Sequence, residues 1–178
     1  MADSLIVEER SGFGLATVMG RKAVSATALG NALGFSPPEG PVRIKRDGIA
    51  WIGTGPATWL AMTDAPEIGW PASLEQRLKG LASISDQSGS YRIFRLAGDR
   101  ARSLLQRGAF IDLHADAFPQ GSVATTVIAH IGVVFWQTDD DPAAFEVATF
   151  RSYAPSFLRW LNATSKGLDH LPSRAMRF

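Results

Sequence analysis

Apolar and polar residues follow one another along the chain with two different periods, and the order of these periods predicts the secondary structure. After a glycine-rich turn at 12–14, the run LATVMG (15–20) has the short apolar character of a strand that ends at Gly20. Residues 26–34 carry apolar side chains every three or four positions and finish on glycine, which predicts a helix. Three strand-like runs and a further helix follow, at 41–46, 50–54, 58–62 and 73–83.

The same order of elements begins again after residue 84. A strand at 92–98 and a helix at 100–108 each end on a glycine; three strand-like runs and a final helix follow, at 123–129, 132–137, 145–150 and 152–165. The order strand, helix, three strands, helix therefore occurs twice. This predicts an α+β fold of two similar β-α-β-β-β-α halves, about 12–83 and 84–166, in a single domain over 1–178 with a short C-terminal tail.

Two local correspondences support a duplication. Gly20 and Gly98 stand at the same strand-to-helix corner. The turn before the last strand of each half reads GPATW (55–59) or DPAAF (141–145), and both are Pro-Ala-x-aromatic. Coincidence is the alternative, because any α+β chain can be divided into pieces that look alike. The matched glycines and turns favour the repeat.

The corner at Gly98 has the order of elements of a nucleotide-binding loop, because a strand runs through a glycine turn directly into a helix. A loop that cradles phosphate needs several glycines, whereas this one has a single glycine followed by Asp99. Asp99 is predicted to cap the helix, and its charge would repel an anion. Ala101, Leu104 and Leu105 form one apolar helix face, so we interpret the corner as structural.

Composition narrows the classes of function. The net charge of +1 gives little support to nucleic-acid binding or to a polybasic membrane contact. The absence of cysteine excludes disulfides, thiolate metal sites and thiol nucleophiles. The first residues lack the apolar run of a signal peptide, and no window is long enough for a membrane span, so a soluble cytoplasmic protein is expected. Only 20% of the residues are charged, which hints that a partner protein covers part of the surface.

The residues with catalytic or metal-binding potential are scattered along the chain. His114, His130 and His170 lack the spacing of metal ligands on one element, and we interpret His130 as a turn residue. The acidic run 139–141 precedes a proline and predicts a solvated hairpin tip. Residues 88–90, Ser-Gly-Ser, lack the pattern of a nucleophile elbow. From the residues alone we expect no catalytic, cofactor-binding or metal-binding residue in this chain.

The predicted last helix carries Tyr153, Phe157, Trp160 and Leu161 at helical spacing. Large apolar side chains in this pattern are typical of a face packed against the core. A groove for a partner protein is the alternative, because large aromatic residues also anchor interfaces.

Several runs resemble the gamma subunit of heterotetrameric sarcosine oxidase: RGAFIDLH (107–114), TTVIAHIGVV (125–134) and RSYAPSFLRWL (151–161). The opening run LIVEERSGFGLATVMGRK (5–22) is also similar to that subunit, whereas about 35–83 is less distinctive. This family belongs to a wider group with the folate-binding domain of glycine-cleavage aminomethyltransferases. The resemblance therefore implies the same fold of two β-α-β-β-β-α halves that the repeat predicts.

The resemblance implies a role inside an enzyme complex. In such an oxidase an alpha subunit binds NAD and tetrahydrofolate, a beta subunit holds FAD, FMN lies between the two, and a delta subunit holds zinc. Sarcosine is demethylated to glycine, hydrogen peroxide forms, and folate captures the one-carbon unit as methylene-tetrahydrofolate. The resemblance thus implies a non-catalytic structural subunit that contacts alpha, with beta and delta in the full complex, and that carries no cofactor of its own.

One departure from the wider group matters for function. The aminomethyltransferases place acidic residues at the turn before the strand that corresponds to VVFWQ, whereas this turn reads His130-Ile131-Gly132 here. No acidic residue lies between Asp116 and Asp139. The missing carboxylate and the short length favour the structural subunit. The main alternative is a stand-alone folate-binding or folate-dependent aminomethyl-transfer protein, and a scaffold for another dimethylglycine-type oxidase is a weaker one.

Overall fold

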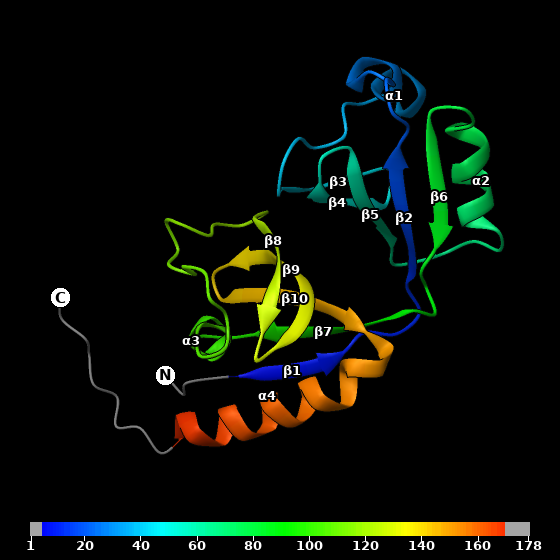
Figure 1. Cartoon of the computed structure of the whole chain (residues 1–178). Coiled ribbons are helices and arrows are strands. Elements are labelled where there is room, and N and C mark those ends of the chain that lie inside the picture. The colour runs from blue at the N-terminus through cyan, green and yellow to red at the C-terminus, as the bar shows by residue number, and fades with distance from the viewer. Residues whose placement is uncertain (1–4, 170–178) are drawn as a thin grey trace.

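The computed structural model describes residues 5–169, which form two five-stranded antiparallel sheets with helices on their outer faces (Figure 1). The first half supplies β2 (Gly14–Gly20), α1 (Ala26–Leu33), β3 (Arg43–Arg46), β4 (Ile49–Gly55), β5 (Thr58–Thr63) and α2 (Trp70–Arg77). The second half supplies β7 (Tyr91–Ala97), α3 (Ala101–Gln106), β8 (Val123–Ile128), β9 (Ile131–Asp140), β10 (Ala143–Phe150) and α4 (Ala154–Asp169). These elements confirm the predicted α+β fold with two similar halves.

Two further short strands cross between the halves. β1 (Ile6–Glu9) precedes the first half in sequence but pairs antiparallel with β7 of the second half. β6 (Ala82–Asp86) directly precedes the second half but pairs with β2 of the first half. The sheet orders are β1-β7-β10-β9-β8 and β6-β2-β5-β4-β3. Each half therefore gives its leading strand to the sheet of the other half.

The two sheets pack against each other through one apolar layer, and helices cover their other faces. In β5, Trp59 and Ala61 pack toward α1 and α2, whereas Leu60 and Met62 pack between the sheets. The layer between the sheets draws on both of them and contains Leu15, Ala50, Ile52, Leu60, Met62, Ile93, Val123, Val134, Trp136 and Ala148. Burial on both faces explains why the strands read as continuous apolar runs instead of a clean alternation.

The helix predicted at 73–83 is wrong at both ends. α2 begins at Trp70, where Gly69 (φ 77°) turns the chain and Pro71 occupies the first turn, in which its missing N–H costs nothing. The helix ends at Arg77, ahead of Gly80 (φ 80°), and residues 82–86 form β6 instead. β6 exists because the edge of β2 offers hydrogen-bonding groups, a long-range pairing that local spacing does not reveal.

The backbone N–H and carbonyl of Gly98 are both hydrogen-bonded within the fold, as the structural interpretation of this corner predicts. Gly98 is buried with φ 109°, its N–H donates to the Ala143 carbonyl over 3.0 Å, and its carbonyl accepts from the Ala101 N–H at 2.9 Å. The Gly98 N–H is therefore not available to an anion. In the first half the Gly20 N–H donates in the same way to the Ala57 carbonyl, at 2.8 Å.

The predicted cap at this corner is wrong, although the predicted apolar face of the helix is confirmed. The N-cap position of α3 is held by Arg100, whose side chain makes no capping hydrogen bond, so Asp99 lies one residue too early. Ala101, Leu104 and Leu105 are all buried. Packing of this face fixes the short helix instead of a side-chain cap.

The apolar face of the last helix is confirmed in part. Phe157 and Leu161 are buried, and Trp160 packs half-buried against Phe157 with ring centroids 5.7 Å apart. Tyr153, however, is 51% exposed, so its assignment to the core face is wrong. It belongs to a 3-10 turn, Arg151–Tyr153, whose tighter winding takes the side chain out of phase with α4. Among the described helices none is long and apolar enough to cross a membrane.

Candidate functional site

The two halves meet where β3 and β8 begin, and equivalent residues bond to each other there. Val42 and Ser122 form an antiparallel bridge. The Arg43 N–H donates to the Gly121 carbonyl over 2.7 Å, and the Val123 N–H donates to the Pro41 carbonyl over 2.9 Å. The hydrogen bond from β3 to the second half has a counterpart from β8 to the first half. The two halves are therefore related by an approximate twofold axis at this point. Positions on either side of the axis can therefore be compared directly.

The last two strands of each half form a hairpin, and these two hairpins give the most informative comparison. In the first half Trp59 of β5 lies opposite Gly53 of β4, and in the second half Phe145 of β10 lies opposite Gln137 of β9. A register shift interrupts the ladder beside these pairs in both hairpins. Equivalent aromatic side chains thus face a glycine in one half and a glutamine in the other. In the second half polar side chains fill the space beside the aromatic ring, and in the first half the 38–41 loop takes it up: the Gly40 carbonyl oxygen lies 2.0 Å from where a Gly53 Cβ would stand, and the Pro38 carbonyl accepts from the Trp59 indole N–H.

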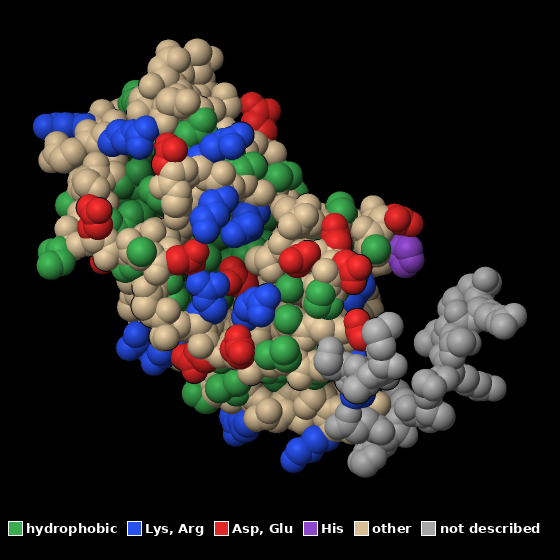
Figure 2. Space-filling model, turned by 180° about the vertical axis from the view of Figure 1, so that it is seen from behind, with side chains coloured by type: hydrophobic (Ala, Val, Ile, Leu, Met, Phe, Trp, Pro, Cys, Tyr) green, Lys and Arg blue, Asp and Glu red, His purple; other side chains and the backbone are tan. Residues whose placement is uncertain are grey.

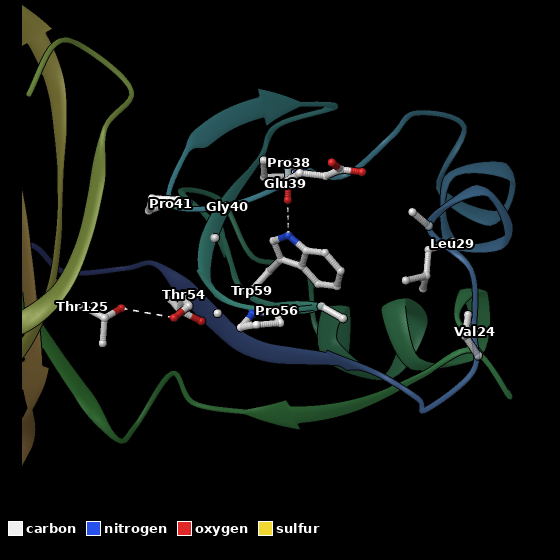
Figure 3. Close-up of a pocket in the computed structure, with 14 residues that line it drawn as sticks. Val24, Leu29, Pro38, Glu39, Gly40, Pro41, Thr54, Pro56, Trp59 and Thr125 are labelled. Carbon is white, nitrogen blue, oxygen red and sulfur yellow. Dashed lines mark hydrogen bonds between the residues drawn. The ribbon is translucent and has the colours of Figure 1, made fainter.

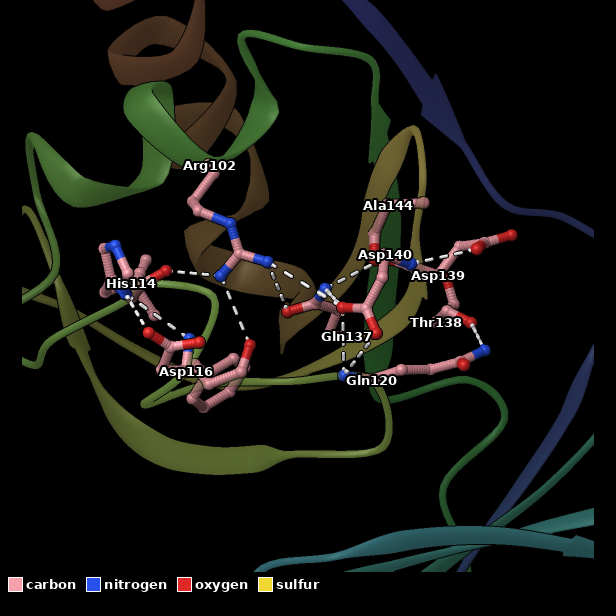
Figure 4. A network of polar contacts seen from close by, with 11 residues as sticks. Arg102, His114, Asp116, Gln120, Gln137, Thr138, Asp139, Asp140 and Ala144 are labelled. Carbon is pink, nitrogen blue, oxygen red and sulfur yellow. Dashed lines mark hydrogen bonds and ion pairs between the residues drawn. The ribbon is translucent and has the colours of Figure 1, made fainter.

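In the second half the space is filled by the Arg102 cluster, which we define as Arg102, Gln137, Asp140 and Gln120 (Figure 4). Arg102 reaches from α3 and donates to the Gln137 side-chain oxygen over 3.0 Å. The Gln137 amide nitrogen donates in turn to Asp140 and, over 2.9 Å, to the Asp139 carbonyl. The Gln120 N–H donates to Asp140 over 3.1 Å. Gln137 is fully buried, and every polar atom of its side chain has a partner.

The Arg102 guanidinium is also held by main-chain and aromatic groups. It donates to the carbonyls of Leu113 and Phe118 and lies 5.2 Å from the ring centroid of Phe145. Burial lowers the pKa of the Arg102 guanidinium, and the negative charge of Asp140 acts in the opposite direction. The cluster binds one partly buried cation with carbonyls, a carboxylate and an aromatic face, which is the set of groups that a guanidinium prefers.

Beside Trp59 in the first half lies a hollow of about 590 Å³, which we call the Trp59 pocket (Figure 3). Gly53 contributes no side chain, and a Cβ there would lie 2.0 Å from the Gly40 carbonyl oxygen. The close approach of the 38–41 loop therefore requires glycine at 53. The walls of the pocket are Val24, Ala26, Leu29, Pro38, Glu39, Gly40, Pro41, Gly53, Thr54, Gly55, Pro56, Ala57, Trp59 and, from β8, Thr125.

The Trp59 pocket has few polar groups. The Trp59 indole N–H donates to the Pro38 carbonyl over 2.8 Å, and the Thr125 hydroxyl lies 3.5 Å from the Thr54 carbonyl oxygen (Figure 3). Glu39 is the one charged residue of the lining, and within residues 5–169 no cation forms an ion pair with it. Neither threonine hydroxyl is bonded to a basic side chain in this lining. The pocket therefore has the groups to bind a ligand but no activated nucleophile.

A separate ion-pair network ties the two sheets together. The Trp136 indole N–H donates to the buried Glu146 over 2.9 Å. The Arg10 guanidinium forms ion pairs with both Glu146 and Asp64, and its distance to the Asp64 carboxylate is 2.7 Å. Lys45 adds a second contact to Asp64 at 3.1 Å. Partial burial acts to raise the pKa of the Asp64 carboxyl, but hydrogen bonds and charges from Lys45 and Arg10 outweigh it and lower the pKa. Figure 2 shows basic and acidic side chains interspersed across the middle of the face seen from behind, so neither sign of charge dominates this face.

The structure places the histidines away from any common site. His130 is exposed at the turn between β8 and β9 with φ 65°, which confirms its interpretation as a turn residue. His114 is exposed in a loop beside Asp116, at 3.4 Å. His170 lies outside the described residues. In the part of the chain that the structure describes, no group of three histidine, aspartate or glutamate residues is placed to hold a metal ion.

The other sequence candidates are also structural. Asp139 and Asp141 are exposed at the β9–β10 turn, as the solvated hairpin tip predicts, while Asp140 in addition accepts the hydrogen bonds of the Arg102 cluster. Ser88 lies in a turn, where its hydroxyl accepts from the Leu15 N–H over 3.0 Å and donates back to the Leu15 carbonyl. This serine therefore ties the turn to the backbone of β2.

Sequence reasoning missed the residues of the Arg102 cluster and of the Trp59 pocket. Gln137 carried a usable signal, because a glutamine at the end of the apolar run VVFWQ is a polar residue in a buried strand. Arg102 and Glu39 carried no such signal, since charged residues in a helix and in a Pro-Pro-Glu-Gly loop are ordinary. Their importance depends on the pairing of distant segments.

Comparison with known proteins gives consistent results. Residues 22–167 match the family described as sarcosine oxidase, gamma subunit family. The chain is 32% identical over 133 residues to the sarcosine oxidase subunit gamma of Arthrobacter sp, covering 70% of this chain and 64% of that protein. It is 26% identical over 159 residues to the subunit gamma of Corynebacterium sp. (strain P-1), covering 82% and 74%. The chain thus spans somewhat under two thirds of the length of the Arthrobacter relative.

Two solved structures show the same fold. A chain of the heterotetrameric sarcosine oxidase from Corynebacterium sp. U-96, in complex with pyrrole 2-carboxylate, aligns with a TM-score of 0.79 and 21% identity, covering 92% of this chain and 85% of that one. The glycine cleavage system aminomethyltransferase T from Bartonella henselae aligns with a TM-score of 0.65 and 13% identity, covering 88% of this chain and 45% of that one. The fold is therefore shared with both.

Proposed function

The chain belongs to the sarcosine oxidase gamma subunit family, and we propose that it is a non-catalytic structural subunit that contacts the alpha subunit of a heterotetrameric sarcosine oxidase. The observation that carries this proposal is the family match over residues 22–167, which includes nearly all of both halves. The complex, with beta and delta subunits, would act in the cytoplasm. It would convert sarcosine to glycine with formation of hydrogen peroxide and methylene-tetrahydrofolate.

The geometry of the described residues supports a structural role. His130 occupies the place where aminomethyltransferases are expected to carry acidic residues, and it is exposed at a hairpin tip. Chemistry on a folate-bound one-carbon unit requires a carboxylate within hydrogen-bond reach of the reacting nitrogen. We propose that FAD, FMN, NAD, tetrahydrofolate and zinc are bound by the other subunits.

Co-expression tests the structural role directly. The chain, produced together with a candidate alpha subunit, is expected to co-elute with it in size-exclusion chromatography, because a permanent interface buries roughly 1,600 Å² or more. Separate elution at micromolar concentration and low salt would contradict the assignment. The same alpha subunit mixed with an unrelated chain of similar size serves as the control.

Measurements on the isolated chain separate the structural role from the folate alternative. The purified chain is expected to show no flavin absorbance, no sarcosine-dependent peroxide formation and only weak heat of binding with tetrahydrofolate. Binding of tetrahydrofolate at low micromolar concentration that is lost in His130→Ala would favour a folate-dependent protein instead. Asn162→Ala, an exposed change on α4, is a suitable control variant.

A further inference from the structure

We propose that an uncharged surface on the inner faces of the two sheets, the neutral patch, binds an uncharged segment of the alpha subunit. This inference rests on the proposed function, because it locates the contact between the two subunits. The neutral patch consists of Thr17, Met19 and Ser85 on one sheet and Val127, Gly132 and Phe150 on the other.

The neutral patch lies where neither sheet covers the inner face of the other. The strands of the two sheets run in crossing directions, so these faces overlap only in part (Figure 1). Leu15 and Ala148 lie in the buried layer between the sheets. Met19 and Phe150 follow them on the same strands at even spacings and therefore face the same way, yet they are 50% and 47% exposed.

A second uncovered part of the inner faces, the charged patch, gives an internal comparison. It consists of Glu8, Arg10, Lys45, Asp64 and Arg95. Lys45 and Arg10 both pair with Asp64, and Glu8 stands opposite Arg95 between β1 and β7. Mixed charges of this kind are typical of a surface that faces water.

Thr17 and Ser85 take the places that Arg95 and Glu8 have in the other half. Thr17 stands opposite Ser85 between β2 and β6, as Arg95 stands opposite Glu8 between β7 and β1. Thr17 and Arg95 each stand three residues before the glycine at the strand-to-helix corner of their half. Two hydroxyl groups therefore replace two charges of opposite sign.

Phe150 takes the place of Asp64. Phe150 stands five residues after Phe145, and Asp64 stands five residues after the equivalent Trp59. An aromatic ring therefore replaces a carboxylate. The approximate twofold axis thus exchanges the charged patch with the neutral patch, and the fold itself does not require uncharged residues at these positions.

The absence of charge from the neutral patch fits burial under another protein. All six of its residues are uncharged, and Met19, Val127 and Phe150 present large apolar side chains that are 42–50% exposed. The centres of protein interfaces are depleted of charged residues and enriched in methionine and aromatic residues. Exposed apolar side chains gathered in one place mark such an interface.

The chemistry of the neutral patch specifies the segment that binds. A charge on that segment would lose its water without gaining a counter-charge, which is costly, so the segment is uncharged. Gly132 stands opposite Val127, and a Cβ at Gly132 would meet no atom within 4 Å, so an apolar side chain of alpha fits there. Thr125, on the same strand as Val127, lines the Trp59 pocket. The pocket therefore extends this surface toward the roughly 800 Å² that each partner contributes to a standard interface.

The first test transfers the charges of one patch to the other. Biolayer interferometry measures the affinity of the purified full-length chain for the alpha subunit. The double variant Thr17→Arg with Ser85→Glu leaves the net charge unchanged and is expected to weaken binding at least about tenfold, because two charges must lose their water at the interface. The reverse double variant, Arg95→Thr with Glu8→Ser, is the matched control and is expected to bind like the wild type.

A second variant tests the same surface without adding charge. Gly132→Leu is expected to weaken binding about tenfold, because its side chain occupies the space assigned to alpha. Its melting temperature should equal that of the wild type, since the added atoms meet only open space. Gly167→Leu on α4 is the control, because Gly167 is also exposed with no atom within 4 Å of an added Cβ.

The outcomes distinguish this inference from the proposed function. If the wild-type chain does not bind alpha at all, the structural role fails and the inference fails with it. If the wild-type chain binds alpha and Gly132→Leu binds equally well, the structural role stands and the inference is wrong. The inference would also be overturned if the charged-patch variant alone lost affinity, or if the isolated chain formed a dimer that Gly132→Leu abolished, because a second copy would then be the occupant.

Discussion

Gly98 illustrates how a single residue can be required by backbone geometry alone. Its φ of 109° lies outside the regions that side-chain-bearing residues readily adopt, and its N–H and carbonyl are both bonded within the fold. The glycine is therefore needed for the corner between β7 and α3 and not for a ligand.

Gly98→Val should lower the free energy of unfolding by about 2–3 kcal/mol, because valine is strained at this φ and Gly98 is buried. Urea titration followed by circular dichroism measures the change. Gly132→Val is the matched control, since Gly132 is exposed and a Cβ there meets no atom within 4 Å. Equal stability of the Gly98 variant and wild type would mean that the corner does not depend on glycine.

Asp64 gives a prediction about pH. Its carboxyl has a pKa below the usual value of about 3.9, so the folded state binds the proton less readily than the unfolded state does. The stability that Asp64 contributes is therefore present above pH 4 and is lost as the pH falls through the lowered pKa. Asp64→Asn should flatten the decline of unfolding free energy below pH 4, measured by urea titration at several pH values. An unchanged slope would show that other carboxyls dominate the acid response.

At the scale of elements, the exchanged leading strands are the feature on which the two halves depend. β1 pairs with β7 through a register in which Glu8 lies opposite Arg95 and Val7 opposite Leu96. The Arg10 N–H donates to the Ile93 carbonyl over 2.8 Å. Because backbone N–H groups alternate in direction along a strand, the Glu8 N–H also faces β7, whereas the Val7 N–H faces away from it. β1 is exposed along its length, and its stability comes from this pairing.

Proline substitutions test the pairing of β1. Glu8→Pro should destabilise the chain by roughly 1–3 kcal/mol, because it removes a ladder hydrogen bond to β7. Val7→Pro is the control, because the N–H that this change removes faces away from β7 and takes no part in the pairing. Hydrogen exchange should show faster exchange in β7 for the Glu8 variant alone. Similar exchange in both variants would show that β1 does not protect β7.

At the scale of the whole molecule, the apolar layer between the sheets joins the two halves into one core. Ile52 from the first half and Trp136 from the second are both fully buried in this layer. With the strand exchange and the Arg10 network, this layer makes separate unfolding of either half costly. We expect the chain to unfold in one cooperative transition.

Ile52→Ala should lower the unfolding free energy by about 2–5 kcal/mol, the usual cost of truncating a buried aliphatic side chain. The loss should appear equally in both sheets when amide exchange is followed by mass spectrometry. Val127→Ala, which removes methyl groups from a partly exposed position, is the control. Loss of protection confined to the first half would contradict a shared core.

Local sequence by itself determined most elements of this protein. The apolar runs that became β2, β4, β5, β7, β9 and β10, the glycines at both corners and the repeated Pro-Ala-x-aromatic turns are short-range signals, so the duplication could be read without a structure. His130 as a turn residue followed in the same way. These features depend on neighbouring residues, whose steric and hydrogen-bonding preferences the sequence contains directly.

Only the tertiary structure decided the rest. β1 and β6 exist because the edges of distant strands offer hydrogen bonds, and so the helix predicted through residue 83 gave way to a strand. In the second half Gln137 stands opposite Phe145 and joins the Arg102 cluster, whereas in the first half Gly53 stands opposite Trp59 and the 38–41 loop packs against it; strand register and the approach of that loop set both arrangements. Pairing of distant segments depends on the free energy of the whole chain, which local periodicity does not contain.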